Sequence, residues 1–410
     1  MRLLVVSQYF WPENFRVNDL TAEFASRGHQ VTVLTGKPNY PGGRVYDEYR
    51  KDPRAFAGYE GARIVRVPML ARGHGGLRLL LNYLSFAISA SVLGAWKLRG
   101  EKFDAVFVYE PSPATVGVPG VVLRCFKRAP MAFWVLDLWP ETLQAIGAVK
   151  SNRLLALVGR LMTFIYRRCD LILAQSRSFI PQIRRYAGAA SRVEYFPSWA
   201  ESVFQLSVVA PAAEVTPHSG FTVMFAGNIG EAQDFPAILN AAQALKGRAD
   251  IRWLVLGDGR MKPWVEQEIA SRGLQGTVRL LGSYPVERMP SFFAHVDALL
   301  VSLKDEPIFA MTIPGKLQAY LASGIPVLGM INGEGAELLM KSGAGLACAA
   351  GDFEGLTQAV LRLAQMDRQE RQAMGQQGYA LYASEFDRKL LMDKAEGWLL
   401  GLADLGRRTS

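Results

Sequence analysis

Short runs of apolar, often β-branched residues alternate with helical patterns along almost the whole chain. Each apolar run has the length of one strand, and most are followed by an amphipathic stretch, the first over about residues 17–27. Strands that are apolar on both faces and are separated by helices are typical of parallel sheets. The runs predict strands over residues 3–6, 31–34, 64–67, 105–108, 131–136, 171–173, 193–196, 222–226, 251–256, 278–280, 298–301 and 326–328.

The strands fall into two series, which predict two doubly wound α/β domains. Between the series, residues 205–220 (QLSVVAPAAEVTPHSG) are poor in charge and rich in Ala, Pro and Val, as expected of a linker. We therefore expect a first domain over 1–204 and a second over 221–385. Open α/β sheets bind ligands beyond the carboxyl ends of their strands, so a cleft between the domains is the expected site.

One long helical pattern in the first domain, from Leu77 to Leu98, contains 18 successive uncharged residues, from Leu79 to Trp96. That length is at the lower limit for a membrane span. A polar stripe of Arg78, Asn82, Ser85 and Ser89 follows one face, which favours a core helix over a span. A helix lying in the membrane interface is the intermediate alternative.

A second helix is basic and amphipathic. From Ser151 to Arg168, arginines recur at Arg153, Arg160 and Arg167, between Leu, Val, Met, Phe and Ile. Such a helix can lie on anionic lipid with its arginines at the headgroups, or it can be a surface helix whose arginines are solvated. Ser151 is placed as its N-cap.

Composition excludes several classes. The chain has 410 residues, half of them hydrophobic and a fifth charged, so disorder and coiled coils do not fit. The three cysteines are far apart, which argues against a zinc site or a disulfide framework. The first residues enter a strand pattern directly and lack the cleavage region of a signal peptide, so we expect a cytoplasmic protein.

The net charge of +9 is unevenly distributed. Residues 1–200 hold 27 Lys and Arg against 14 Asp and Glu, a net +13, whereas residues 201–410 carry a net −4. A basic surface attracts polyanions, which here means nucleic acid, anionic lipid or phosphorylated substrates.

Glycine turns in the second half suggest a phosphate site. In FAGNIGEAQDF, Gly227 and Gly230 follow a strand and precede a helix, so their N–H groups can approach a phosphate, while Asn228 and Gln233 offer neutral hydrogen bonds. Gly257 in VLGDGR repeats the design.

A helix opens at Gly315 in TIPGKLQAYL, with Lys316 in its first turn. A cation is unfavourable at that end of the helix dipole, so Lys316 indicates an anionic partner such as a diphosphate, the alternative being a solvated lysine. Glu334 and Glu337, at the start of another helix, can bind ribose hydroxyls or simply cap that helix.

Two carboxylates follow strands of the first domain. Glu110 comes after AVFVY and Asp137 after MAFWVL, so both are expected in the cleft, where either could accept or orient a hydroxyl proton. Asp137 can equally cap the next helix. The chain has no D-x-D pair, no G-x-S-x-G motif and no Walker loop, and its histidines lack metal-ligand spacing.

These segments resemble glycosyltransferase family 4, in particular bacterial enzymes of O-antigen, capsule and exopolysaccharide assembly that transfer amino-deoxy sugars of the fucosamine type. The likeness covers nearly the whole chain and is carried by WPEN, SRGHQVTVLTGKPNYPGG, WVLDLWPETLQAIG, VEYFPSWAE, FAGNIGEAQ and TIPGKLQAYLASGIPVLG.

The resemblance implies a GT-B fold, with two Rossmann-like domains facing a cleft. It implies a nucleotide sugar on the second domain, an acceptor on the first, retention of anomeric configuration and no bound metal or other cofactor. In that fold the last helix, over 386–410, packs back on the first domain.

The chain departs from the broad family at charged positions. The usual glutamate pair is expected at Met311 and Ala319, and the usual Arg and Lys after the first strand of the second domain are replaced by Asn228 and Gln233. Lys316 and the glycine N–H groups must therefore supply more of the diphosphate site, and Glu334 or Glu337 the ribose contacts.

The expected function is transfer of a sugar from a UDP-sugar to a polyprenyl-diphosphate-linked glycan acceptor in surface polysaccharide synthesis. The protein would sit peripherally on the inner face of the cytoplasmic membrane, through the helices of residues 77–98 and 151–168. Asp137 would orient or deprotonate the acceptor, and Lys316 would stabilise the leaving diphosphate. A soluble UDP-sugar 2-epimerase of the same fold is the main alternative, and a basic nucleic-acid-binding protein is the remote one.

Overall fold

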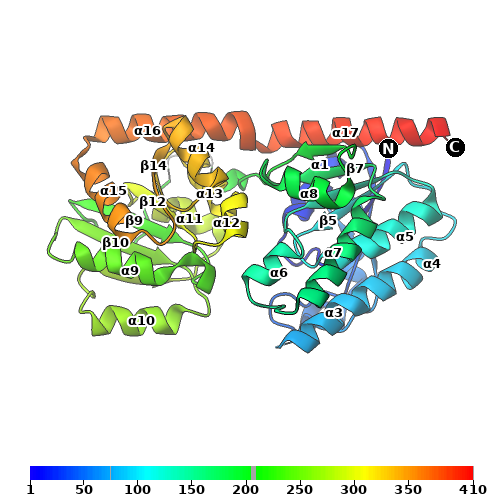
Figure 1. The fold of residues 1–410 in the computed structure, drawn as a ribbon, viewed down its shortest axis with the longest axis horizontal. Helices are drawn as coiled ribbons and strands as arrows, with labels where there is room; N and C mark the ends of the chain where they lie inside the picture. The colour runs from blue at the N-terminus through cyan, green and yellow to red at the C-terminus, as the bar shows by residue number, and fades with distance from the viewer. Residues whose placement is uncertain (74, 205–208, 410) are drawn as a thin grey trace. The chain divides into compact units, whose positions relative to one another are not determined.

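The computed structural model describes residues 1–73, 75–204 and 209–409, which form two compact units. The first unit contains Met1–Phe196 together with Met392–Ser410, and the second is Pro197–Leu391. Each unit is built around its own sheet (Figure 1).

The first unit contains an eight-stranded sheet in the order β3-β4-β2-β1-β5-β6-β7-β8, parallel except for the β3–β4 pair. Its central strands are apolar on both faces and buried on both, as the sequence predicts. The strands are β1 (Arg2–Val6), β2 (Gln30–Thr35), β3 (Gly58–Tyr59), β4 (Ala62–Arg66), β5 (Ala105–Glu110), β6 (Met131–Val135), β7 (Leu171–Ala174) and β8 (Val193–Tyr195).

Helices connect these strands and cover the sheet. They are α1 (Arg16–Ser26), α2 (Asp47–Lys51), α3 (Gly76–Ser89), α4 (Ala95–Lys97), α5 (Gly117–Lys127), α6 (Glu141–Ala145), α7 (Asn152–Tyr166) and α8 (Phe179–Ala187). A π-helical turn, Ala90–Gly94, joins α3 to α4. We call the continuous segment Gly76–Lys97 the α3–α4 helix.

The second unit contains a fully parallel six-stranded sheet in the order β11-β10-β9-β12-β13-β14. Its strands are β9 (Phe221–Ala226), β10 (Ile251–Leu256), β11 (Val278–Gly282), β12 (Ala298–Ser302), β13 (Val327–Met330) and β14 (Gly345–Cys348). Its helices are α9 (Phe235–Ala244), α10 (Lys262–Ser271), α11 (Met289–Phe293), α12 (Pro307–Met311), α13 (Gly315–Ala322), α14 (Glu334–Ser342), α15 (Phe353–Gln365) and α16 (Arg368–Leu381).

In both sheets the chain order reverses next to the first strand, between β1 and β5 and between β9 and β12. Loops at such a switch point leave a crevice at the carboxyl edge of the sheet, which is where α/β proteins bind ligands. The two switch points therefore define where each unit should carry its functional residues.

The segment expected to be a linker is only partly one. Residues 205–208 lie outside the described residues. Farther along, Ala212 and Val215 are buried, and the Ala212 N–H donates to the Ser291 carbonyl at 2.9 Å, because these apolar side chains pack on the second unit. The chain from Pro197 to Leu391 belongs to that unit.

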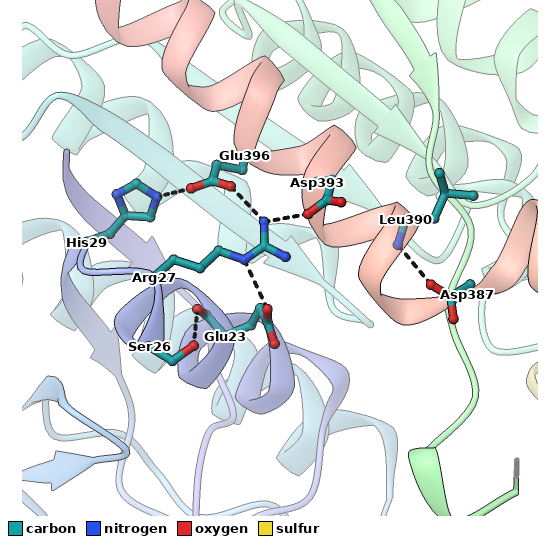
Figure 2. A network of polar contacts seen from close by, with 8 residues as sticks. All are labelled: Glu23, Ser26, Arg27, His29, Asp387, Leu390, Asp393 and Glu396. Carbon is teal, nitrogen blue, oxygen red and sulfur yellow. Dashed lines mark hydrogen bonds and ion pairs between the residues drawn. The ribbon is translucent and has the colours of Figure 1, made fainter.

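The last helix, α17 (Arg388–Thr409), joins the first unit from Met392 on. Figure 2 shows its attachment to α1: Arg27 pairs with Asp393 and Glu396, each at 2.7 Å, and with Glu23 at 3.0 Å. His29 Nε2 lies 2.6 Å from Glu396 Oε1. These partly buried contacts fix the start of the docked segment.

Candidate functional site

The two glycine turns of the second unit pack backbone against backbone at its switch point. Gly227 has φ 135° and Gly257 has φ 144°, a region that side chains rarely adopt. A Cβ on Gly257 would lie 1.9 Å from the Gly227 carbonyl oxygen. The turns are also joined by the Ile229 N–H, which donates to Asp258 O at 2.8 Å. The structure thus brings together two turns that the sequence identified separately.

The loop after β9 is further fixed by the strand across the switch point. The Ser302 hydroxyl donates to Gln233 O at 2.7 Å, and the Lys304 N–H donates to Ala232 O at 2.9 Å. Within this loop Gly230 is buried with an ordinary φ of −116°, whereas Asn228 is exposed. The rigid corner is therefore made by Gly227, and Asn228 is available to a ligand.

Lys316 lies over that corner from the first turn of α13, which opens at the exposed Gly315. Its Nζ donates to Gln233 Oε1 at 2.7 Å and lies 3.7 Å from the centroid of the Phe225 ring. A Cβ on Gly227 would come within 2.5 Å of the lysine stem. Only glycine at 227 leaves room for the lysine to reach this position.

The environment of Lys316 is apolar. Burial lowers the pKa of its amine from 10.5 to about 7. Among the residues that the structure describes, no carboxylate pairs with it. A desolvated amine whose hydrogen-bond partner is a neutral amide can gain a favourable interaction by binding an anion.

Tyr320, one helical turn after Lys316, is a positioning residue that sequence reasoning missed. Its buried hydroxyl donates to Ala226 O at 2.9 Å and accepts from Ala226 N–H at 3.0 Å. It thereby holds the end of β9 just before the glycine turn. No local sequence signal marks this role, because an aromatic residue in an apolar helix fits many surroundings.

The two glutamates of α14 differ in their surroundings. Glu334, the first residue of the helix, is buried. Glu337 is exposed and pairs with Lys341 on its own helix at 2.8 Å. The geometry favours Glu334 over Glu337 for contacts with a ligand at this helix start, and both assignments stay predictions.

The structure brings Asp137 and Glu110 together at the carboxyl edge of the first sheet. The Asp137 N–H donates to Glu110 Oε2 at 3.3 Å, and the Leu136 N–H donates to Glu110 O at 3.1 Å. Glu110 is fully buried, and burial together with the charge of Asp137 raises its pKa well above the usual range. Glu110 therefore supports the main chain of Asp137 from a buried position, and a catalytic role for it stays a prediction.

Asp137 itself is held by neighbouring donors. The Thr142 hydroxyl donates to its Oδ1, and Trp139 Nε1 donates to its Oδ2 at 3.4 Å. Burial raises its pKa despite these hydrogen bonds. The ring of Tyr83, on α3, lies 6.2 Å from that of Trp139 and completes this edge of the sheet.

The α3–α4 helix corrects an expectation. It is long and apolar enough to cross a membrane. Only a third of the residues in its most apolar 18-residue segment are buried, so it is not a core helix. Apart from the exposed Arg78, its polar stripe faces inward: Asn82 Oδ1 accepts from Gln8 Nε2 at 2.8 Å and from the Tyr9 hydroxyl at 3.0 Å. The hydrophobic side chains left exposed, which we call the outer face, are Leu77, Leu80, Leu81, Leu84, Ile88, Val92, Leu93 and Trp96.

Helix α7 combines exposed apolar and basic residues. Leu157 and Phe164 are exposed, and they lie between the exposed Arg153, Arg160 and Arg167 at helical spacing. Ser151 is at the N-cap position but its side chain makes no capping hydrogen bond. Both α3 and α7 pack against α5, so the two helices lie in the same helical layer of the first unit (Figure 1).

No group of three or more His, Cys, Asp or Glu that could hold a metal ion occurs among the described residues. Metal independence stays a prediction.

Comparison with known proteins identifies the family. The model for a glycosyl transferase 4-like domain matches residues 14–199, and the model for glycosyl transferases group 1 matches residues 220–366. The chain belongs to glycosyltransferase family 4. It is therefore a transferase, and the resemblance drawn from its motifs is confirmed at the level of the family.

Among curated proteins, this glycosyltransferase is similar to the putative colanic acid biosynthesis glycosyl transferase WcaI of Escherichia coli, with 26% identity over 340 residues, 79% of this chain and 82% of the relative. It is also similar to the 2-deoxystreptamine N-acetyl-D-glucosaminyltransferase of Niallia circulans, with 22% identity over 143 residues, 35% of this chain and 36% of the relative.

Solved structures confirm the fold. Alr3699/HepE of Anabaena, solved in complex with UDP, aligns with a TM-score of 0.70 at 14% identity, over 98% of this chain and 100% of that one. WaaG, a glycosyltransferase involved in lipopolysaccharide biosynthesis, aligns with a TM-score of 0.68 at 14% identity, with the same coverage. The predicted GT-B architecture of two parallel-sheet α/β domains is thus correct.

Proposed function

We propose that this glycosyltransferase moves a sugar from a UDP-sugar to a lipid-diphosphate-linked acceptor in the assembly of a bacterial surface polysaccharide. The observation that carries the proposal is Lys316, a desolvated amine over the Gly227 turn that has no carboxylate partner among the described residues. A diphosphate supplies the charge that this position lacks. The relatives named for colanic acid and lipopolysaccharide biosynthesis, and the neighbour solved with UDP, support the same assignment.

In the proposed reaction the bond from the anomeric carbon to the UDP oxygen breaks, and a bond to the acceptor hydroxyl oxygen forms. Lys316 and the N–H groups of the Gly227 turn stabilise the charge that develops on the leaving diphosphate. Asp137, fixed by Thr142 and Trp139, orients the acceptor hydroxyl or takes its proton. In the alternative mechanism without a protein base, the departing phosphate takes the proton of the acceptor hydroxyl. We propose retention of configuration and no requirement for a metal.

The donor sugar that we propose is an N-acetylated amino-deoxy sugar of the fucosamine type. The motif resemblance supports this, as does the relative named for N-acetylglucosaminyl transfer. Glu334 is the proposed ribose contact, since it is the buried glutamate at the start of α14. We further propose a cytoplasmic enzyme bound peripherally to the inner face of the membrane, which the outer face of the α3–α4 helix and the arginines of α7 support.

The test is a thermal-shift and calorimetric screen of the full chain against UDP, GDP and TDP, and then against their sugars. UDP is expected to stabilise the protein, and GDP and TDP are not. A chelator is present in every sample, so stabilisation by UDP must occur without a metal ion. Lys316→Ala should remove the stabilisation by UDP, whereas Lys341→Ala, whose exposed side chain pairs with Glu337, should keep it. Turnover of the best UDP-sugar without any lipid acceptor would favour the epimerase and contradict the proposal.

A further inference from the structure

A guanidinium group surrounded by tyrosines lies just before α3. The Arg72 guanidinium lies 5.1 Å from the centroid of the Tyr40 ring, which in turn lies 5.3 Å from the Tyr9 ring, and its charge acts on the Tyr9 and Tyr83 hydroxyls. The main chain at this point is fixed, because the Arg72 N–H donates to Asn39 Oδ1 at 2.7 Å. Arg72 is therefore a positioned, half-buried cation.

The tyrosines orient Arg72 without neutralising it. The Tyr9 hydroxyl donates to Asn82, and burial raises its pKa to about 12, so the phenol is uncharged at neutral pH. Burial likewise raises the pKa of Tyr83. In residues 1–73, 75–204 and 209–409, no carboxylate lies within ion-pair distance of Arg72. A fixed guanidinium with aromatic walls and no counter-charge suits a phosphate, which it can bind through two parallel hydrogen bonds.

The position of Arg72 indicates where that phosphate comes from. The residues that follow it begin the α3–α4 helix, whose outer face exposes Leu77 by 72% and Ile88 by 65%. The inner face of the same helix carries Asn82, which accepts from Tyr9, and Tyr83, whose ring lies 6.2 Å from that of Trp139, the donor to Asp137. One helix thus presents apolar side chains outward and links Arg72 to the candidate acceptor carboxylate inward.

We propose that Arg72 binds a phosphate of the acceptor's lipid-linked diphosphate while the outer face of the α3–α4 helix lies in the acyl region of the same bilayer. The inference deepens the proposed function and rests on it. It adds the residue that recognises the diphosphate. It also explains why an arginine held in place by Asn39 and Tyr40 lies a few residues before an exposed apolar helix. A diphosphate at the headgroup level would meet Arg72, and its lipid chain would run along the outer face.

The test is binding of the full chain to three kinds of vesicle: phosphatidylcholine alone, phosphatidylcholine with phosphatidylglycerol, and phosphatidylcholine with a polyprenyl diphosphate. Arg72→Gln should weaken binding to the diphosphate vesicles by about ten- to a hundredfold, the range of a lost charged hydrogen bond, and should change binding to phosphatidylglycerol little. Arg72→Lys should fall between, since it keeps the charge and loses the planar fork. Arg78→Gln, which removes an exposed charge nearby, is the matched control and should lower binding to both anionic vesicles slightly and equally.

Tyr9→Phe provides a second, milder variant. It removes the hydroxyl that holds the Tyr9 ring against Asn82 and next to Tyr40, so it should weaken diphosphate binding in the same direction by a smaller factor. If Arg72→Gln and Tyr9→Phe bind diphosphate vesicles like the unchanged protein, the assignment of Arg72 is wrong. Equal losses of binding to diphosphate and phosphatidylglycerol vesicles also overturn it, because Arg72 would then contribute only a general attraction to anionic surfaces.

Failure of the proposed function looks different. If the unchanged protein binds diphosphate vesicles no better than phosphatidylcholine, the lipid-diphosphate acceptor is wrong, whatever the variants do. Stabilisation by UDP tests the donor half separately, and Arg72→Gln should leave it unchanged. Inorganic diphosphate completes the comparison: if it displaces the protein from diphosphate vesicles at equal phosphate concentration, the site takes free diphosphate and the lipid assignment is overturned.

Discussion

Lys316 shows how a binding residue can lower the stability of the empty protein. In the unfolded chain its amine has the ordinary pKa of 10.5, and burial lowers the pKa to about 7 in the folded chain. Between these values the unfolded state binds more protons, so this group makes the free energy of unfolding rise as the pH rises through that window. At neutral pH the folded protein therefore carries an uncompensated desolvation cost.

Lys316→Met is expected to raise the stability of the ligand-free protein at pH 7 by about 1–2 kcal/mol, because a side chain of similar length replaces a buried amine. The same variant should lose stabilisation by UDP. Denaturant unfolding with and without UDP measures both effects. A variant that is less stable than the unchanged protein without UDP would show that the contacts to Gln233 and Phe225 outweigh the desolvation cost.

The pH dependence of UDP binding follows from the same group. A bound diphosphate favours the charged amine, so binding is accompanied by proton uptake above about pH 7. The Kd for UDP should then rise by up to about tenfold per pH unit above that point. Calorimetry in buffers of different ionisation enthalpy measures the proton uptake directly. Lys316→Met should show no uptake, and a Kd that is flat from about pH 7 to about pH 9 in the unchanged protein would contradict the assignment.

Some of these residues could be found from the sequence and others could not. Lys316 and the glycines were recognisable because a cation at a helix start and glycines after a strand are unusual locally. Tyr320 and Arg72 carry no such signal: an aromatic residue in an apolar helix and an arginine in a loop fit many surroundings. Their roles come from contacts with Ala226 and with Tyr40, residues remote in sequence.

At the scale of elements, strands were the most predictable part. Every strand expected from an apolar run is present, because burial on both faces leaves a strong pattern. The strands that were missed are β3, which is very short, and β14, whose sequence GLAC has no β-branched residue. The polar stripe of the α3–α4 helix predicts a core helix, because such a stripe on an apolar helix usually faces water. Here hydrogen bonds from Gln8 and Tyr9 satisfy Asn82 inside, so the pattern is inverted.

The inverted helix leads to a prediction about membrane binding. Replacing Leu77, Ile88 and Val92, which are among the most exposed residues of the outer face, with serine should lower partition into phosphatidylcholine vesicles by about a hundredfold or more. Vesicle flotation measures the partition. Because these side chains are exposed, the unfolding temperature should change little. Met340→Ser, at an exposed position of α14, is the control and should float like the unchanged protein.

The attachment of α17 gives a second prediction at this scale. Burial opposes ionisation of Glu396, but hydrogen bonds from Arg27 and His29 outweigh it and hold its pKa below the usual range. The network therefore stabilises the fold above the usual glutamate range and is lost as the pH falls through the lowered pKa. Arg27→Met should lower the free energy of unfolding by about 1–3 kcal/mol and speed hydrogen exchange in the first turns of α17.

Arg407→Met provides the matched comparison for Arg27→Met. Arg407 is an exposed arginine of α17, 3.7 Å from Asp104, and its loss should cost less than about 1 kcal/mol. Equal losses for the two variants, or a loss in Arg27→Met that does not shrink at acid pH, would mean that the network does not hold the helix.

At the scale of the whole molecule, charge and apolar exposure coincide. The net +13 of residues 1–200 lies in the part of the chain that carries the α3–α4 helix and α7, whereas residues 201–410, with a net −4, carry the Lys316 site. A uniform basic surface would suit nucleic acid. A basic unit with an exposed apolar face suits an anionic bilayer better, because a bilayer can bury the exposed leucines and the phosphate backbone of a nucleic acid cannot.

Salt dependence separates these two partners in the intact protein. Raising the salt from about 0.1 M to about 1 M shortens the Debye length from about 10 Å to about 3 Å and should remove the electrostatic part of binding to phosphatidylglycerol vesicles. The apolar part should remain, so binding is expected to fall to the level measured on phosphatidylcholine and no further. Binding to duplex DNA, if any, should vanish over the same range, since it would rest on charge alone. Retention on DNA at high salt, or complete release from both vesicles, would contradict a membrane surface built from arginines and an exposed apolar helix together.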